Sequence, residues 1–444
     1  MAEKIKFDQK LPKEIQYALA LRQSAIRDFE TALETGRHPV SLGLALADVG
    51  MDTTPVLQTL QLPIHTVSAE FSPDELVNIR LQQRAQIIAR AGNVGEARRM
   101  VESIPPEQLT LINPYLEIAQ AQQRLDQDSS EMFQKAEKIA RTPGRTDWLN
   151  DYDQIFRLSK VAEAKGAVGM DFKELGDELI SRASELTHWK TASIETVVGV
   201  LILAKRFQEA VLLTDQVPND RVLKKHILFS LARAQALEGD SQVTEVVERF
   251  KGVENVSGAE IQAEIYATLA YGQAKKGIPP FKAVDQALQG HKPTDDPYWQ
   301  VGMYGFIGAT YKIVGENRSV PFKIALANAQ RIPKSEDRAD ALLKLAEMVD
   351  SIGFDAKPLY QAAITAADSI SPHPLYHQDQ SVNEMLSKLA TFESIIESLI
   401  DKKYFDQARE ILSYFRDDEV KTAELLIQLA HAQALESKRL LEAA

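Results

Sequence analysis

The chain has 444 residues, no cysteine, and 51 basic against 63 acidic side chains, which gives a formal net charge of −12. A chain without cysteine forms no disulfides, no cysteine-ligated zinc or iron–sulfur centre and no cysteine nucleophile, and the acidic excess argues against a dedicated nucleic-acid binder. Hydrophobic residues make up 44% of the chain and charged residues 26%, as in folded globular proteins. At roughly 100–200 residues per domain, the length predicts two to four globular domains or one extended repeat array.

The first residues, MAEKIKFDQKLPKE, contain no apolar core of the length found in secretory signals. No stretch approaches the roughly 18 uninterrupted apolar residues that a membrane-spanning helix needs. We therefore expect no membrane span and a cytoplasmic location.

The N-terminal part predicts a small helical region. Residues 14–36 have the pattern of a long helix, 41–50 of a shorter helix and 54–60 of a third, and Pro63 and Pro73 bracket a loop. We assign residues 1–72 to an N-terminal helical cap or docking module, which is either a degenerate first repeat or a separate module.

Prolines recur after predicted helix ends at a regular interval. They stand at positions 105, 143, 218, 333 and 372, so that successive gaps are 38, 75, 115 and 39 residues. Since proline cannot continue a helix, each marks a stop. The gaps are close to one, two, three and one multiples of about 38 residues, a length typical of helix-pair repeats.

Each repeat unit shows the same order of residue types. A first helix carries an aliphatic residue followed by alanine, a turn with glycine comes about eight residues later, and a second amphipathic helix follows. We expect the first helices to begin near residues 75, 110, 147, 191, 221, 259, 297, 336 and 381. The segment IETVVGVLILA (194–204) reads as a buried helix, and period-2 alternation is nearly absent, so the predicted class is all-α.

One repeat carries the motif Tyr304-x-x-Ile307-Gly308-x-x-Tyr311, which continues to a glycine turn at Gly315 and ends at Pro333. It resembles the tetratricopeptide-repeat superfamily of helical-hairpin solenoids, whose pattern is W-x2-L-G-x2-Y, although most units here are longer and less regular than that family's. The resemblance implies an α-solenoid of about nine to eleven antiparallel helix hairpins forming a right-handed superhelix. The array would span residues 73–417, and residues 418–444 would be a C-terminal capping helix.

Three groups of residues invite a chemical interpretation, and for each we favour a structural one. His373 and His377 are four apart, but flanking prolines place them in a loop. The acid pairs at 295–296 and 417–418 precede helices, so Asp296 and Asp418 are predicted N-caps. Three glycines spaced three apart predict close helix packing, since no phosphate-loop lysine accompanies them (Gly302, Gly305 and Gly308). We therefore expect no catalytic set, no metal site and no cofactor, and a protein that is not an enzyme.

The leading functional prediction is a protein-interaction scaffold or adaptor that binds a peptide or a partner helix on the concave face of the solenoid. Long polar side chains on first helices can reach a ligand backbone or carboxylate. The candidate binding residues chosen on this ground are Arg80, Lys224, Tyr271, Lys312 and Arg338.

The sequence is also compatible with other functions. Residues 1–72 could make the protein a peptide-sensing regulator with an effector-docking module, although LALADVGMDTTPVLQTL has no arginine or lysine for reading DNA. RNA binding by a helical repeat is opposed by the net charge, and a helical-toroid enzyme by the lack of convergent acid pairs. Residues 334–444 carry 20 acidic and 12 basic side chains, a net charge of −8, which would suit a basic partner or keep the array in solution. Homo-oligomers stay open, as does the choice between an open superhelix and a closed ring.

Overall fold

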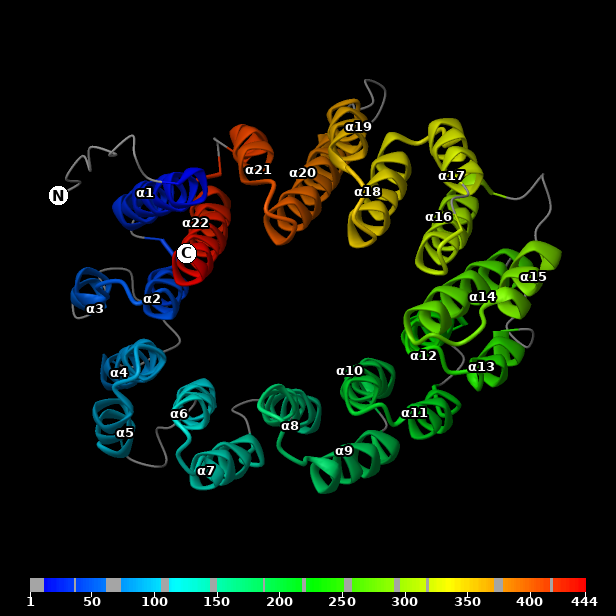
Figure 1. Cartoon of the computed structure of the whole chain (residues 1–444). Helices are drawn as coiled ribbons and strands as arrows, with labels where there is room; N and C mark the ends of the chain where they lie inside the picture. Colours follow the sequence, from blue (N-terminus) through cyan, green and yellow to red (C-terminus); the bar gives the residue numbers. More distant parts are fainter. Residues whose placement is uncertain are drawn as a thin grey trace. The chain divides into compact units, whose positions relative to one another are not determined.

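The computed structural model describes residues 12–35, 37–60, 73–104, 112–143, 150–186, 188–217, 221–250, 258–290, 296–316, 319–370, 378–415 and 418–444. Within these ranges the regular structure is helical throughout, with α-helices α1 to α22, a 3₁₀ helix η2 and no strand (Figure 1). The predicted all-α class is confirmed. No helix in the described ranges is both long and apolar enough to cross a membrane.

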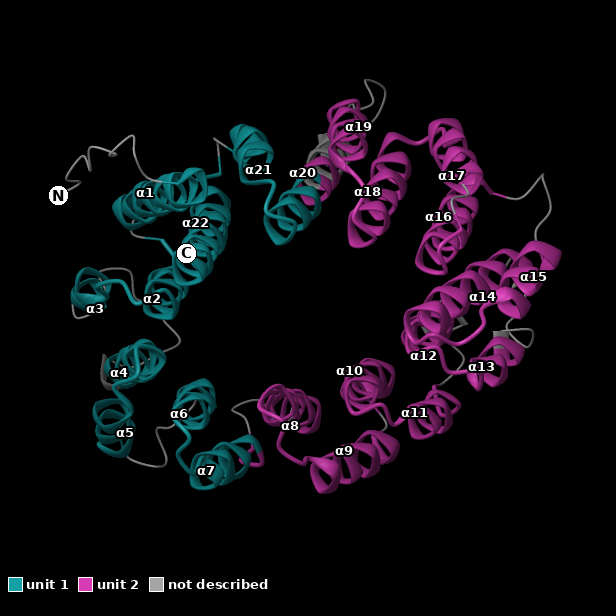
Figure 2. Ribbon diagram, in the orientation of Figure 1, with its two compact units in different colours: residues 1–140, 392–444 teal, residues 141–391 magenta. Residues whose placement is uncertain are grey.

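The chain forms two compact units (Figure 2). Unit 1 comprises Met1–Ala140 and Phe392–Ala444, and unit 2 comprises Arg141–Thr391. The division falls within α20 (Gln378–Asp401). The other helices of unit 1 are α1 (Lys13–Thr35), α2 (Pro39–Asp48), α3 (Thr54–Thr59), α4 (Pro73–Arg90), α5 (Val94–Glu102), α6 (Asn113–Arg124), α7 (Ser130–Ala140), α21 (Phe405–Ile411), η2 (Leu412–Phe415) and α22 (Glu419–Ala443).

Unit 2 is a row of helix hairpins. Its helices are α8 (Asn150–Ala167), α9 (Lys173–Glu185), α10 (Lys190–Leu203), α11 (Phe207–Thr214), α12 (Arg221–Leu237), α13 (Val243–Phe250), α14 (Gly258–Lys275), α15 (Phe281–Gly290), α16 (Pro297–Ile313), α17 (Val320–Arg331), α18 (Ser335–Ser351) and α19 (Lys357–Asp368). Each even-numbered helix packs on the odd-numbered helix that follows it, and each from α8 to α16 also packs on the next even-numbered helix. We call α8, α10, α12, α14, α16 and α18 the first-helix layer and their partners the second-helix layer (Figure 2).

The helix boundaries follow the sequence signals closely. Each first helix from α4 to α20 begins within three residues of its predicted start. Glycines with positive φ angles of 64° to 83° end α12, α14, α16 and α18, because a left-handed residue reverses the chain at low cost only when it lacks a Cβ (Gly239, Gly277, Gly315 and Gly353). The predicted N-caps are confirmed: a carboxylate oxygen of Asp296 accepts from the Tyr298 amide, and one of Asp418 accepts from the Lys421 amide.

Two of the five prolines that were predicted to follow helix ends lie among the described residues, and both do follow one. α7 ends at Ala140 before Pro143, and α17 ends at Arg331 before Pro333. The prolines at 105, 218 and 372 lie outside the described residues, as does the predicted loop after Pro63.

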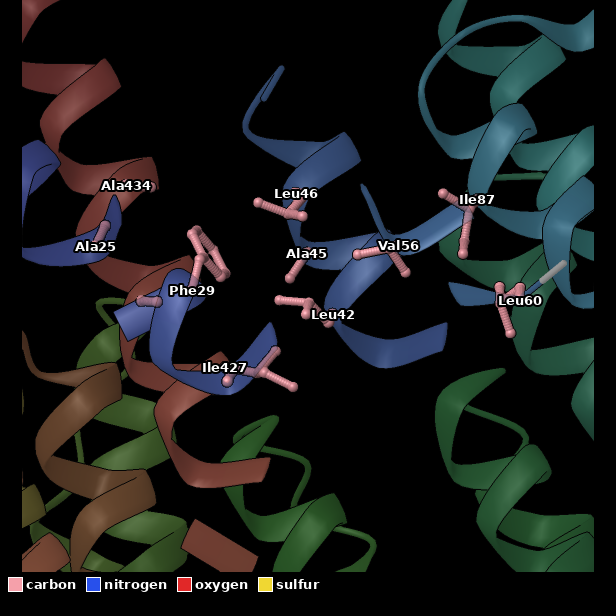
Figure 3. Close-up of a cluster of buried hydrophobic side chains, with 12 residues drawn as sticks. Ala25, Phe29, Leu42, Ala45, Leu46, Val56, Leu60, Ile87, Ile427 and Ala434 are labelled. Atoms are coloured by element: carbon pink, nitrogen blue, oxygen red, sulfur yellow. The ribbon is translucent and has the colours of Figure 1, made fainter. Parts of the chain in front are cut away.

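The core of unit 1 joins the two ends of the chain. α1 packs along α22, and α2 contacts α1, α4 and α22. Twelve buried apolar side chains form one cluster, in which Phe29 is 3% exposed (Figure 3). They come from five helices and one following residue: Ala25, Phe29 and Ala32 of α1, Leu42, Ala45 and Leu46 of α2, Val56 of α3, Leu60, Ile87 of α4, and Ile427, Ala430 and Ala434 of α22.

Polar contacts reinforce the same junction. The buried Ser437 hydroxyl donates to the Ala18 carbonyl at 2.6 Å, and the Arg409 guanidinium donates to the nearly buried Asp28 carboxylate, at 2.7 Å for one of the two bonds. The last helix therefore has the first helix as its packing partner. The predicted division into residues 1–72, 73–417 and 418–444 stays a prediction, while the observed packing connects α1–α3 both to α4 and to α22.

Candidate functional site

A cavity of about 420 Å³ lies in the first-helix layer of unit 2. Four consecutive first helices contribute to it, α12, α14, α16 and α18, and their order in the layer follows the chain. The volume is in the range of small-ligand pockets, roughly 300–1,000 Å³. We call it the Glu264 cavity; it is lined by His226, Phe229, Ser230, Arg233, Glu264, Tyr298, Trp299, Val301, Gly302, Ala341 and Lys344.

Glu264 is the most unusual of these residues. It is only 8% exposed, and no described residue forms a hydrogen bond with its carboxylate. The carboxylate lies against α16 at Gly302, where an added Cβ would stand 2.9 Å from Glu264 Cδ. Burial raises the pKa of Glu264 to about 7, although the positive charges of Arg233 and Lys344 act in the opposite direction. Near neutral pH this buried acid is therefore close to the midpoint of its titration.

A second polar group on the wall of the cavity is internally satisfied. The Tyr298 hydroxyl donates to the Asp340 carboxylate and accepts from the Lys344 ammonium, which also lies 2.8 Å from Asp340. Burial raises the pKa of Tyr298 to about 12, and the Asp340 contact adds to the rise while Lys344 opposes it. Burial lowers the pKa of Lys344, but Asp340 and Tyr298 outweigh it and the net shift is upward. Lys344 and Asp340 thus neutralise each other.

Arg233 is the counterpart of Glu264. Its Nε atom is buried without a hydrogen-bond partner among the described residues. Although its charge attracts Glu264, no direct ion pair joins the two side chains in the described part of the chain. Among the described residues of the cavity, the Glu264 carboxylate thus has no donor and the Arg233 Nε has no acceptor.

Aromatic rings form another wall. Trp299 meets Phe229 edge to face, with ring centroids 5.6 Å apart at 79°, and meets Tyr298 at 5.6 Å and 89°. The start of α16 holds these rings in place, because Asp296 caps the helix and its own amide donates to Glu260 of α14 at 2.8 Å. The partner acid of the predicted pair, at position 295, lies outside the described residues.

The five predicted binding residues are placed elsewhere, and none of them is among the described residues that line this cavity. Tyr271 on α14 is buried, with its hydroxyl 3.4 Å from the Ser351 hydroxyl and its ring 5.6 Å from that of Phe306. Lys312 on α16 is exposed and holds its ammonium 4.7 Å from the Phe354 ring centroid. Tyr271 therefore has a packing role between first helices.

The other three candidates are partly exposed. Arg80 on α4 belongs to unit 1 and donates to Gln83 at 3.4 Å. Arg338 on α18 donates to the Ile332 carbonyl and the Ser335 hydroxyl, each at 3.1 Å, and so fastens the turn that precedes its own helix. Lys224 lies in the first turns of α12, two residues before His226 of the cavity. A binding role for any of the five stays a prediction.

Sequence reasoning missed the Glu264 cavity although one signal was present. Glu264 lies three residues from both Ile261 and Ala267 in the first helix AEIQAEIYATLAYG, so helical spacing places a charge on a largely apolar face, where it is unexpected. The glycine series did predict close packing, and the structure confirms it: an added Cβ at Gly305 would meet Met348 at 2.5 Å, and one at Gly308 would meet the Phe322 ring at 2.8 Å. His373 and His377 lie outside the described residues.

The fold defines the chain as a helical-repeat protein of the α-solenoid class. No protein-family profile matches the sequence, and no curated protein is similar to it. Among solved structures, one described as "Circular tandem repeat protein with novel repeat topology and enhanced subunit contact surfaces" aligns with 97% of this chain and 98% of that chain, at 12% identity and a TM-score of 0.20. A similarity at that score supports no further conclusion, and the class assignment rests on the hairpins themselves.

Proposed function

We propose that this protein is a binding scaffold or adaptor with tetratricopeptide-like hairpins, which holds a peptide or partner segment on the first-helix layer of unit 2. The Tyr304, Ile307, Gly308 and Tyr311 motif supports the tetratricopeptide-like character. It lies on α16, where Gly308 lets the Phe322 ring of α17 approach the helix backbone. A small residue at this point of the hairpin is what the resembled pattern requires.

The observation that supports binding is the Glu264 carboxylate in its cavity. A buried polar group without a hydrogen bond costs about 1–3 kcal/mol, and more when it is charged. A ligand that donates to Glu264 would offset this cost, which supports the proposal that the cavity takes an occupant.

The proposal excludes catalysis. The Tyr298 hydroxyl already donates to Asp340 and accepts from Lys344, so it is held as part of the wall. We assign Glu264 to binding and not to proton transfer, because no nucleophile or second acid among the described residues hydrogen-bonds to its carboxylate.

The test is a selection of peptides from a random display library on the full chain. Ser230 is exposed and lines the cavity, so Ser230→Trp fills the entrance without burying a new group. We expect wild type to enrich a family of peptides that Ser230→Trp does not bind. Ser181→Trp is the matched control, because Ser181 is exposed on α9 in the second-helix layer. Enrichment of the same peptides by Ser230→Trp would contradict the proposal, and so would the absence of any enriched family.

A further inference from the structure

We propose that the Glu264 cavity takes the cationic side chain of a basic peptide segment, an arginine or a lysine, with its charge at Glu264 and its carbon stem against Trp299 and Phe229. The inference rests on the proposed function, since it supposes a peptide partner, and it adds the chemistry that the site selects.

The acid at the cavity accounts for the charge of the guest. Glu264 is buried, lines the cavity and has no hydrogen-bond partner among the described residues, so it lacks a donor. Ammonium and guanidinium groups supply several donors and the opposite charge, which makes the strongest kind of hydrogen bond to a carboxylate. Gly302 is what leaves room for the carboxylate at this point of α16.

Arg233 favours a ligand that carries an acceptor as well as a cation, as a basic residue of a peptide does. Its positive charge would oppose a simple cation, but its unpaired Nε donor can be satisfied by an acceptor. A basic residue within a peptide brings both groups, a cationic tip for Glu264 and a backbone carbonyl for Arg233. One bound residue could thus supply a donor to the Glu264 carboxylate on α14 and an acceptor to the Arg233 Nε on α12.

The aromatic wall suits the same guest. Long basic side chains bury their carbon stems on apolar surface, and a cation within about 6 Å of a tryptophan or phenylalanine ring gains further attraction. Phe229, Trp299, Val301 and Ala341 offer that surface. An acidic side chain would be attracted by Arg233 but repelled by the ionised form of Glu264, and Lys344 is already neutralised by Asp340, so the glutamate amide is the probe that tests this competition.

Binding of a cation should depend on pH with a defined sign. The titratable and charged groups around Glu264 are Arg233 and His226 of α12, Tyr298 of α16, and Asp340 and Lys344 of α18. With a pKa of about 7, Glu264 is ionised in about one molecule in eleven at pH 6 and in about ten of eleven at pH 8. If the ionised form binds the cation, affinity rises about tenfold between these two pH values.

The experiment uses the full chain labelled with 5-fluorotryptophan, whose ¹⁹F signal from Trp299 is assigned by Trp299→Phe. The probes are N-acetyl amides of arginine, lysine, citrulline and glutamate at concentrations up to tens of millimolar. Citrulline keeps the shape of arginine without its charge. We expect the arginine and lysine amides to shift the Trp299 signal, and the citrulline and glutamate amides to bind at least tenfold more weakly.

Matched variants assign the effect to Glu264. Glu264→Gln keeps the size of the side chain and should weaken the arginine amide at least tenfold and remove its pH dependence. Asp285→Asn removes an exposed charge from α15 and should change affinity less than twofold. His226 is exposed and its Nε2 lies 3.8 Å from a Glu195 oxygen, so His226→Gln removes a second ionisable side chain from the cavity wall and should leave the pH slope in place.

The outcomes separate this inference from the proposed function. Equal binding of the citrulline and arginine amides, a preference for glutamate, a shift that survives Glu264→Gln, or no shift of Trp299 by any probe would each overturn the cation inference. The proposed function is judged independently by the peptide selection. A peptide family that depends on the cavity but contains no basic residue would keep the function and reject the cation.

Discussion

Replacing Glu264 by glutamine should stabilise the protein at alkaline pH. Most substitutions of buried residues weaken a fold, but this carboxylate is buried without a hydrogen-bond partner among the described residues, so ionising it opposes folding. Glutamine has nearly the same shape and carries no charge. Substitution of a residue that serves binding at a cost in stability commonly makes a protein more stable.

The magnitude follows from the pKa. The pKa of Glu264 is about 7 in the folded chain against an ordinary value of 4.5. The folded chain therefore holds the proton more tightly than the unfolded chain, and stability falls as pH rises from about 4.5 to about 7. At about 1.4 kcal/mol per pKa unit, the ionised carboxylate costs about 3 kcal/mol at pH 8, and at pH 5 the cost is below about 1 kcal/mol.

The free energy of unfolding is measured by urea denaturation, followed by tryptophan fluorescence, for wild type and Glu264→Gln at pH 5 and pH 8. Trp299 lies at the cavity and reports on this part of unit 2. We expect the variant to be more stable by about 3 kcal/mol at pH 8 and by less than about 1 kcal/mol at pH 5. Asp285→Asn removes an exposed negative charge from the same unit, so it corrects for the net charge of −12 and should change stability by less than about 0.5 kcal/mol.

A variant that is no more stable than wild type at pH 8 would show that ionised Glu264 does not oppose folding, because the carboxylate would then be stabilised by contacts absent from the described structure. A gain of the same size at both pH values would also contradict the prediction. Such a gain would come from packing and not from the charge.

Three further predictions concern the helix packing. Phe29→Ala removes the largest side chain of the cluster in unit 1 and should lower the free energy of unfolding by about 3–4 kcal/mol in a denaturant titration, whereas the exposed control Glu30→Ala should leave it nearly unchanged. Gly308→Ala brings a Cβ within 2.8 Å of an aromatic ring of α17 and should lower the free energy of unfolding by about 1–3 kcal/mol in the same titration. Gly199→Ala in α10 has open space around its Cβ and should raise the free energy of unfolding by about 0.5–1 kcal/mol. Equal effects of the two substitutions would contradict the packing argument. Ser437→Ala removes the 2.6 Å bond from α22 to α1 and should cost about 1 kcal/mol, with faster amide hydrogen exchange in α1; unchanged exchange there would argue against the contact.

Helix starts, helix ends and turns could be predicted from the sequence because their signals act over a few residues. A positive-φ glycine such as Gly277, a stop such as Pro333 and an N-cap such as Asp296 each act on the backbone of their own turn. The repeat period then gave the hairpins, since a helix that cannot bury its apolar face alone must pack on its neighbours. The positions of the first helices followed from these signals to within three residues.

The candidate site was not readable in the same way. The Glu264 cavity is built from residues between His226 and Lys344 on four helices, and no short motif links them. We predicted Arg338 as a binding residue because it is a long polar side chain on a first helix, but it hydrogen-bonds to the turn before its own helix. Arg233, which lines the cavity, was not predicted. The difference lies in the rotation of each helix about its axis, which decides which side chains face a neighbour.

The array of helix hairpins follows from the amino-acid sequence alone, because helix propensity, caps and periodicity are local properties that repeat along it. Two features became visible only in the folded chain: Phe29 shares a core with Ile427, and Glu264, Gly302 and Arg233 line one cavity. Such contacts depend on the rotation and spacing of packed helices. These are set by the sum of many side-chain contacts across the layers and are written in no single segment.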